Sequence, residues 1–216
     1  MKSNTKSFDT KRLVGIAMFA ALAYGVTFVF RIPVMFLTFD AKDTMITIAA
    51  LMYGPVSGVI ISLLAALLEL ITISGTGVYG FIMNFASSAA FSATAALIYK
   101  YKRNASGAII SFYAASVVMV SVMMCLNIFV TPYYMGVSTK TVMDLIPKLF
   151  FPFNLAKALL NSALAMMLYK PVTVAMRRAG LLKGQGKMQI NRSSIAIYIT
   201  AVVTLAVAVV LFVVLT

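Results

Sequence analysis

The chain has 216 residues, of which 62% are hydrophobic and 11% are charged. A water-soluble domain of this length cannot bury so much apolar surface, so the composition predicts a protein embedded in lipid. The absence of histidine and the single cysteine, Cys125, exclude a Ser-His-Asp triad, a histidine-ligated metal site and an internal disulfide.

The formal net charge is +13. Nucleic-acid-binding proteins gather their basic residues on one face or along one helix. Here the basic residues lie in short segments between apolar runs, which is typical of membrane proteins. The charge therefore predicts the lipid bilayer as a partner, and no nucleic acid.

Apolar runs alternate with short polar segments along the chain, and a run of about 20 residues is long enough to span a bilayer. The first run follows a basic N-terminus and continues too far for a cleaved signal peptide, so we expect it to remain as a helix. The second is short and ends at Gly54-Pro55. We expect an amphipathic loop at 31–43 and a polar loop at 131–148. The seven runs cover residues 13–30, 44–53, 56–73, 78–99, 108–130, 149–171 and 195–215. The predicted fold class is an all-α integral membrane protein.

The distribution of lysine and arginine predicts the orientation, because cytoplasmic loops of membrane proteins carry an excess of these residues. With the N-terminus inside, the inner segments hold most of the basic residues, and Asp9 is their only acid. We therefore predict a multi-pass protein of the cell membrane with a cytoplasmic N-terminus.

Two charged residues, Glu69 and Lys157, lie within spanning runs, and Lys157 shares a helix face with Asn154 and Asn161 because their spacings are three and four. Polar groups at membrane depth are costly unless they face a protein interior or an aqueous cavity. Hydrogen bonding between helices is the alternative for Asn161. For Lys157 we expect an interior role, with Glu69 or an adjacent aspartate as its counter-ion.

The polar groups of several predicted helices are expected to lie at one depth in the membrane. Asp40 and Asp43 precede or begin the short second helix, Glu69 ends the third run, and Asn127 lies near the outer end of the fifth. Asn154 and Lys157 begin the sixth run from the same side. The sequence therefore predicts a pocket open to the outside. Asp43 is also expected to cap the helix that begins at Thr44. No nucleophile, metal-ligand set or phosphate loop accompanies the group, so we predict no enzyme.

Four segments together resemble a known family: residues 37–44 (LTFDAKDT), Gly54-Pro55, residues 69–77 (ELITISGTG) and the pair Asn154-x-x-Lys157. They resemble the riboflavin-specific S components of energy-coupling factor (ECF) transporters, over about residues 10–178. The resemblance implies a six-helix membrane bundle that binds riboflavin at its outer face as a transported ligand, with no cofactor. It also implies association with a transmembrane T component and two ATPase subunits, which power import.

The resemblance assigns roles to particular residues. It implies ligand contact by Asn127, Asn154, Lys157 and the loop around Leu37–Asp40, and less directly by Glu69 and Asp43. It implies that the small residues Ala17 and Ala21 of the first helix face the T component. The predicted substrate-binding set is Leu37, Phe39, Asp40, Asp43, Glu69, Asn127, Asn154, Lys157 and Asn161.

The C-terminal part departs from the six-helix plan. We divide the chain into a membrane domain at 1–178, a basic cytoplasmic linker at 179–194 and an additional transmembrane helix at 195–216.

The chemistry of a flavin suits these residues. The pyrimidine edge of isoalloxazine alternates acceptors with an N–H donor, and a carboxamide offers both functions, whereas lysine and carboxylates suit the ribityl hydroxyls. The tricycle needs apolar walls, which Leu37 and Phe39 are expected to supply. Two alternatives stay open: an S component for another vitamin, and a stand-alone facilitator of small-molecule uptake.

Overall fold

The computed structural model describes residues 10–35, 37–183 and 192–215. Within these residues, six helical segments are long and apolar enough to cross a membrane, which confirms the predicted all-α membrane fold. The elements in chain order are α1 (Thr10–Val29), β1 (Arg31–Val34), β2 (Leu37–Asp40), α2 (Lys42–Tyr53), α3 (Pro55–Thr72), α4 (Gly77–Tyr101), α5 (Ala105–Met135), α6 (Thr139–Leu145), the π-helix η1 (Ile146–Phe150), α7 (Phe151–Arg178) and α8 (Arg192–Leu215).

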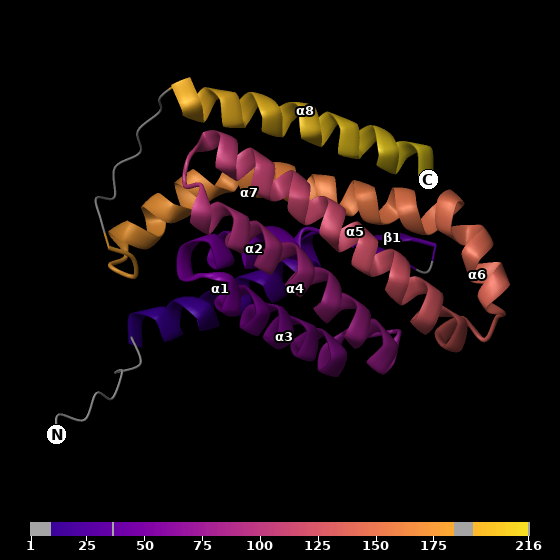
Figure 1. The fold of residues 1–216 in the computed structure, drawn as a ribbon. Helices are drawn as coiled ribbons and strands as arrows, with labels where there is room; N and C mark the ends of the chain where they lie inside the picture. The colour runs from indigo at the N-terminus through magenta and orange to yellow at the C-terminus, as the bar shows by residue number, and fades with distance from the viewer. Residues whose placement is uncertain (1–9, 36, 184–191, 216) are drawn as a thin grey trace.

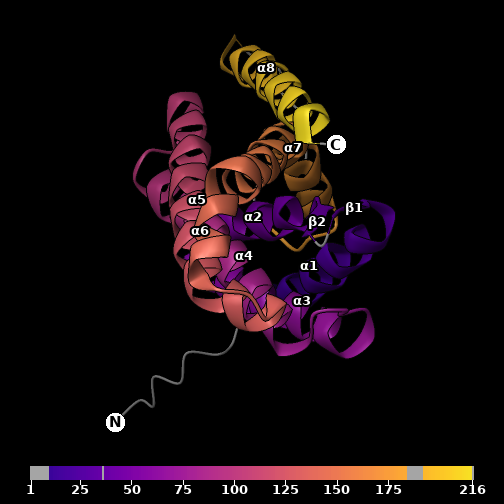
Figure 2. The same ribbon diagram turned by 90° about the vertical axis from the view of Figure 1, so that its right-hand side faces the viewer.

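The long helices run side by side, so the connections gather at two ends of the molecule (Figure 1). One end holds the start of α1, the α4–α5 connection, the end of α7 and the start of α8. The other end holds the hairpin β1–β2, the α3–α4 connection and α6. Helix α8 lies along α7 and α5, on the far side of the bundle from α1 and α3 (Figure 2).

Helix α2 occupies the centre of the bundle, in contact with α1, α3, α4 and α7. Its 12 residues rise only about 18 Å, less than the roughly 30 Å of a bilayer core. It ends at Gly54, whose φ of 99° favours glycine, and Pro55 then begins α3 with its fixed φ. A helix this short cannot reach both membrane surfaces, and its first turn lies inside the protein, where Lys42 and Asp43 are each 1% exposed.

Small residues allow α2, α3 and α4 to pack closely. A Cβ on Gly58 of α3 would lie 2.7 Å from the Cβ of Ala50 and 2.9 Å from the Oγ of Ser92. Only a residue without a side chain fits at this crossing. The adjoining core is apolar and includes Ile46, Ile48, Phe91 and Phe112.

Three local predictions were wrong. Arg31–Val34 and Leu37–Asp40 pair as antiparallel strands, with Arg31 opposite Asp40 and Val34 opposite Leu37, where an amphipathic loop was expected. The expected loop at 131–148 is largely helical, because α5 continues to Met135 and α6 and η1 follow. Asp43 does not cap α2: the helix already begins at Lys42, and Ala41 at the cap position makes no side-chain cap bond.

Candidate functional site

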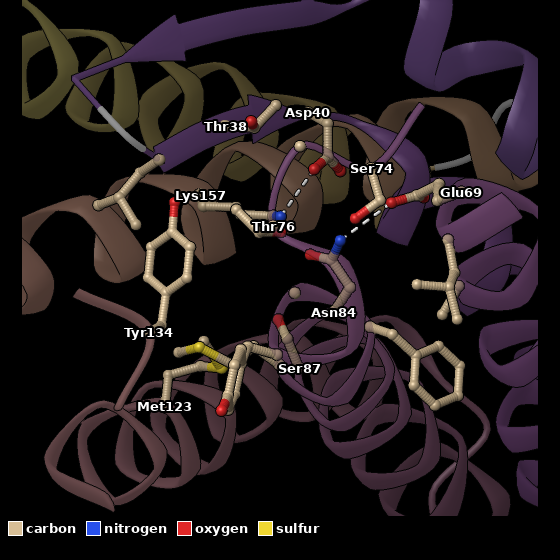
Figure 3. A pocket seen from close by; sticks show the side chains of 18 of the residues that line it. Thr38, Asp40, Glu69, Ser74, Thr76, Asn84, Ser87, Met123, Tyr134 and Lys157 are labelled. Atoms are coloured by element: carbon tan, nitrogen blue, oxygen red, sulfur yellow. Dashed lines mark hydrogen bonds and ion pairs between the residues drawn. The ribbon is translucent and has the colours of Figure 1, made fainter. Parts of the chain in front are cut away.

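A cavity of about 330 Å³ lies at the hairpin end of the bundle, between β2 and helices α3, α4, α5 and α7 (Figure 3). Its polar lining comes from α1, β1, β2, α3, α4, α5, α7 and the α3–α4 connection, which are brought together only by the tertiary fold. The side chains that line it include the polar residues Thr38, Asp40, Glu69, Asn84, Ser87, Asn127, Thr131, Asn154 and Lys157 and the apolar or aromatic residues Leu37, Met83, Met123, Tyr134, Phe150 and Phe153.

Two buried ion pairs form one wall of this cavity. Lys157 Nζ lies 2.8 Å from Asp40 Oδ2. Lys42 Nζ lies 2.7 Å from each carboxylate oxygen of Glu69, and 3.9 Å from Asp40 Oδ2. All four residues are at most 6% exposed. Of the two counter-ions expected for Lys157, the structure therefore selects the aspartate, and Glu69 pairs with Lys42 instead.

Asn84 extends this network on the other side of Glu69. Its Nδ2 donates to Glu69 Oε2 at 3.0 Å, so the carboxylate is held by groups from α2 and α4 (Figure 3). The network thus connects β2, α2, α3, α4 and α7. Three of its charged residues, Asp40, Glu69 and Lys157, also line the cavity.

Two of the three amides predicted from the sequence are held by the preceding helical turn. Asn154 Nδ2 donates to Phe150 O at 2.8 Å, and Asn127 Nδ2 donates to Met123 O at 2.7 Å. Asn127 Oδ1 also accepts from the hydroxyl of Thr131 at 2.9 Å. Both amides therefore line the cavity in defined orientations.

One buried cavity residue has an unused hydrogen-bonding group. Among the described residues, the Oγ of Ser87 is a buried side-chain atom with no hydrogen-bond partner. Buried hydroxyls normally form hydrogen bonds, so a ligand atom could form the one that the Ser87 hydroxyl lacks.

Three predicted contact residues do not line the cavity. Asn161 accepts from the backbone N–H and the hydroxyl of Thr44, at 2.8 and 2.9 Å, and donates to Asp40 O at 3.0 Å. It therefore joins α7 to α2 and the hairpin, which was the alternative expected for it. Asp43 accepts a hydrogen bond from the Ser88 hydroxyl. Phe39 packs on Phe153 in a separate apolar cluster behind the strand.

Several lining residues were not identified from the sequence, notably Asn84, Ser87 and Thr131. Of these three, Asn84 could have been identified from the sequence, because it is an amide inside an apolar run. Serine and threonine gave none, because their hydroxyls can bond to the preceding helical turn and are common in membrane helices.

The predicted partner surface is open. Ala17 and Ala21 are exposed on the outer side of α1, and Gly25 continues the row one turn further. An added Cβ on Gly25 would meet nothing within 4 Å.

Comparisons with known proteins agree with this architecture. The family model described as ECF transporter, substrate-specific component, matches residues 11–169. The riboflavin transporter RibU of Staphylococcus aureus (strain TCH60) is 33% identical over 179 residues, which cover 79% of this chain and 94% of that protein. A solved structure of the S component of a bacterial ECF transporter is 33% identical, with a TM-score of 0.67, and the match covers 78% of this chain and 99% of that one.

Proposed function

The chain belongs to the family of ECF transporter substrate-specific components, and from this premise we propose that its cavity binds riboflavin for uptake into the cell. The observation that carries the proposal is a cavity lined by Asn127, Asn154, Asp40 and Lys157 in a relative of a riboflavin transporter. Its role is to bind and deliver the vitamin, without a catalytic step of its own.

The size and lining of the cavity support a flavin. Small-molecule sites usually measure about 300–1,000 Å³ and combine apolar walls with a few fixed polar groups. This cavity, of about 330 Å³, has aromatic and methionine side chains from α4, α5, η1 and α7 that suit a flat tricycle. The amides of Asn127 and Asn154 suit the pyrimidine edge, and the charged wall suits ribityl hydroxyls.

The buried charges of the site favour an uncharged ligand over an anion, although the exposed Arg31 also lines the cavity. The ammonium groups of Lys42 and Lys157 are both paired with carboxylates, and Asp43 adds a further acid close by. A phosphate group would therefore meet no surplus positive charge along this wall. Riboflavin itself has no phosphate group.

We propose that the cavity opens to the outside of the cell. The start of α1 and the ends of α4 and α7, which carry Lys11, Arg12, Lys100, Arg177 and Arg178, lie at the end opposite the hairpin (Figure 1). Since positive segments stay in the cytoplasm, this distribution supports a cytoplasmic position for that end and an outer position for the cavity. The T component and two ATPase subunits would then drive uptake.

The test is to purify the full chain in detergent, record its absorbance spectrum and titrate it with riboflavin by flavin fluorescence. We expect a bound yellow chromophore and saturable binding, which Asn154→Ala weakens several-fold because one buried hydrogen bond is lost. Ser121→Ala, on the exposed side of α5, is the matched control.

A colourless protein that ignores added riboflavin would contradict the proposal. In that case, competition among other vitamins would decide whether the same cavity serves a different substrate. Uptake in cells without the T and ATPase subunits would instead support a stand-alone facilitator.

A further inference from the structure

Helix α8 lies beyond the residues matched by the family model, which end at 169, yet it is packed into the bundle. Ala201, Thr204 and Ala208 are at most 2% exposed. The hydroxyl of Thr204 lies 2.6 Å from that of Tyr113 on α5, and Ser194 is hydrogen-bonded to Lys170 on α7. Helix α8 is therefore an integral part of this chain's fold.

The last turns of α8 reach the back of the hairpin, at the same end of the molecule (Figure 1). The ring of Phe212 lies 4.8 Å from that of Phe39, measured between centroids, and Phe39 lies 6.0 Å from Phe153 on α7. Val34 of β1 and Leu211 of α8 complete this apolar cluster.

Strand β2 therefore lies between two environments, and Leu37 at its start contacts both. Thr38 and Asp40 line the cavity, and Asp40 holds Lys157. Phe39, between them in sequence, faces the α7–α8 side, because successive side chains of a strand point to opposite faces. Any outward movement of this strand must separate Phe39 from Phe212 as well as Asp40 from Lys157.

A two-stranded hairpin has little stability of its own and depends on what it packs against. We propose that Phe212 is a positioning residue: by packing on Phe39 it holds β2 against the cavity, and so slows the release of bound ligand. The proposal rests on the function proposed above for the cavity. It assigns to α8 a role in ligand retention that the six-helix family plan does not provide.

The test uses the full chain with Phe212→Ala, and with Val210→Ala as the matched control, since Val210 lies on the same helix and is 62% exposed. Hydrogen exchange of the backbone amides of residues 31, 32, 34 and 37–40 is measured without ligand, since Pro33 has no amide hydrogen. Riboflavin dissociation is measured by stopped-flow fluorescence. For Phe212→Ala we expect faster exchange in the hairpin and dissociation about three- to ten-fold faster, the range that the loss of one aromatic pair produces. Val210→Ala should match the wild type.

Two further variants make the outcome decisive. Phe212→Leu keeps apolar volume and should restore most of the protection. If Phe212→Ala does not fold, Phe212→Val, which removes the ring and part of the apolar volume, takes its place. Phe39→Ala combined with Phe212→Ala should release ligand no faster than Phe39→Ala alone, because both remove the same contact.

Unchanged hairpin exchange in Phe212→Ala, or in Phe212→Val where it takes its place, would overturn the proposal, as would faster exchange with an unchanged dissociation rate. If the wild type does not bind riboflavin, the function proposed for the cavity fails, whereas the exchange measurement still decides whether Phe212 positions the strand.

Discussion

At the scale of single residues, the pair formed by Lys157 and Asp40 combines structural and binding roles. Their charged atoms lie 2.8 Å apart, and both residues are nearly inaccessible to solvent. Removing one member of a buried pair leaves an uncompensated charge and typically costs about 3–5 kcal/mol, whereas removing both is often close to neutral. Stability and ligand binding can therefore be separated by substitution.

We predict that Lys157→Met lowers the free energy of unfolding by about 3–5 kcal/mol, because the nearest cation left to Asp40 is the ammonium of Lys42, at 3.9 Å. Adding Asp40→Asn should restore much of the loss while riboflavin binding stays weak. Thermal unfolding of the ligand-free protein by circular dichroism measures the first effect and flavin titration the second. Lys140→Met, at an exposed position of α6, is the control. A double variant as unstable as the single one would show that the pair does not act in this way.

The site residues that could be predicted from the sequence are the amide and charged residues within apolar runs. Asn127, Asn154, Lys157 and Glu69 stand out because an apolar run does not need them, and all four line the cavity. Phe39 was misplaced because its orientation depends on a strand that the sequence did not reveal.

At the scale of elements, the short helix α2 determines where the charged groups lie. It ends at Gly54 after 12 residues, so its first turn lies at the depth of the cavity, where Asn161 of α7 binds Thr44. The crossing of α2, α3 and α4 at Gly58 sets how close these helices approach.

We predict that Gly58→Val destabilises the protein by about 1–3 kcal/mol or more, because the new Cβ would lie 2.7 Å from that of Ala50 in a packed core. Gly25→Val is the matched control, since the same change on α1 meets no atom within 4 Å. The two variants are compared by thermal unfolding. Equal midpoints would mean that the crossing can move apart at little cost.

Long apolar runs predicted the spanning helices well, because length and hydropathy are sufficient for that purpose. They could not reveal the β1–β2 hairpin, whose strands have four residues each and include Pro33. Nor could they reveal the helical structure of 139–150, since a polar helix at the end of a bundle gives no apolar run.

At the scale of the whole molecule, two faces of the bundle differ. Helix α8 covers α7 and α5, whereas the outer side of α1 remains uncovered (Figure 2). The sequence predicted α8 but not its position, because the only polar side chains of this apolar run are hydroxyls, which do not indicate a neighbouring helix. Its position leaves the small-residue row of α1 open for a partner helix.

We propose that this row, Ala17, Ala21 and Gly25, is where the T component docks, because small residues let membrane helices approach closely. We predict that Ala21→Leu reduces co-purification with the T component and ATPase subunits several-fold, while riboflavin affinity stays unchanged because the cavity lies elsewhere. Ala206→Leu, which makes the same enlargement at an exposed position of α8, should leave the complex intact. Both variants are co-expressed with the partner subunits, and the recovered stoichiometry is measured. A complex that survives Ala21→Leu, or one that Ala206→Leu disrupts equally, would place the docking surface on another face of the bundle.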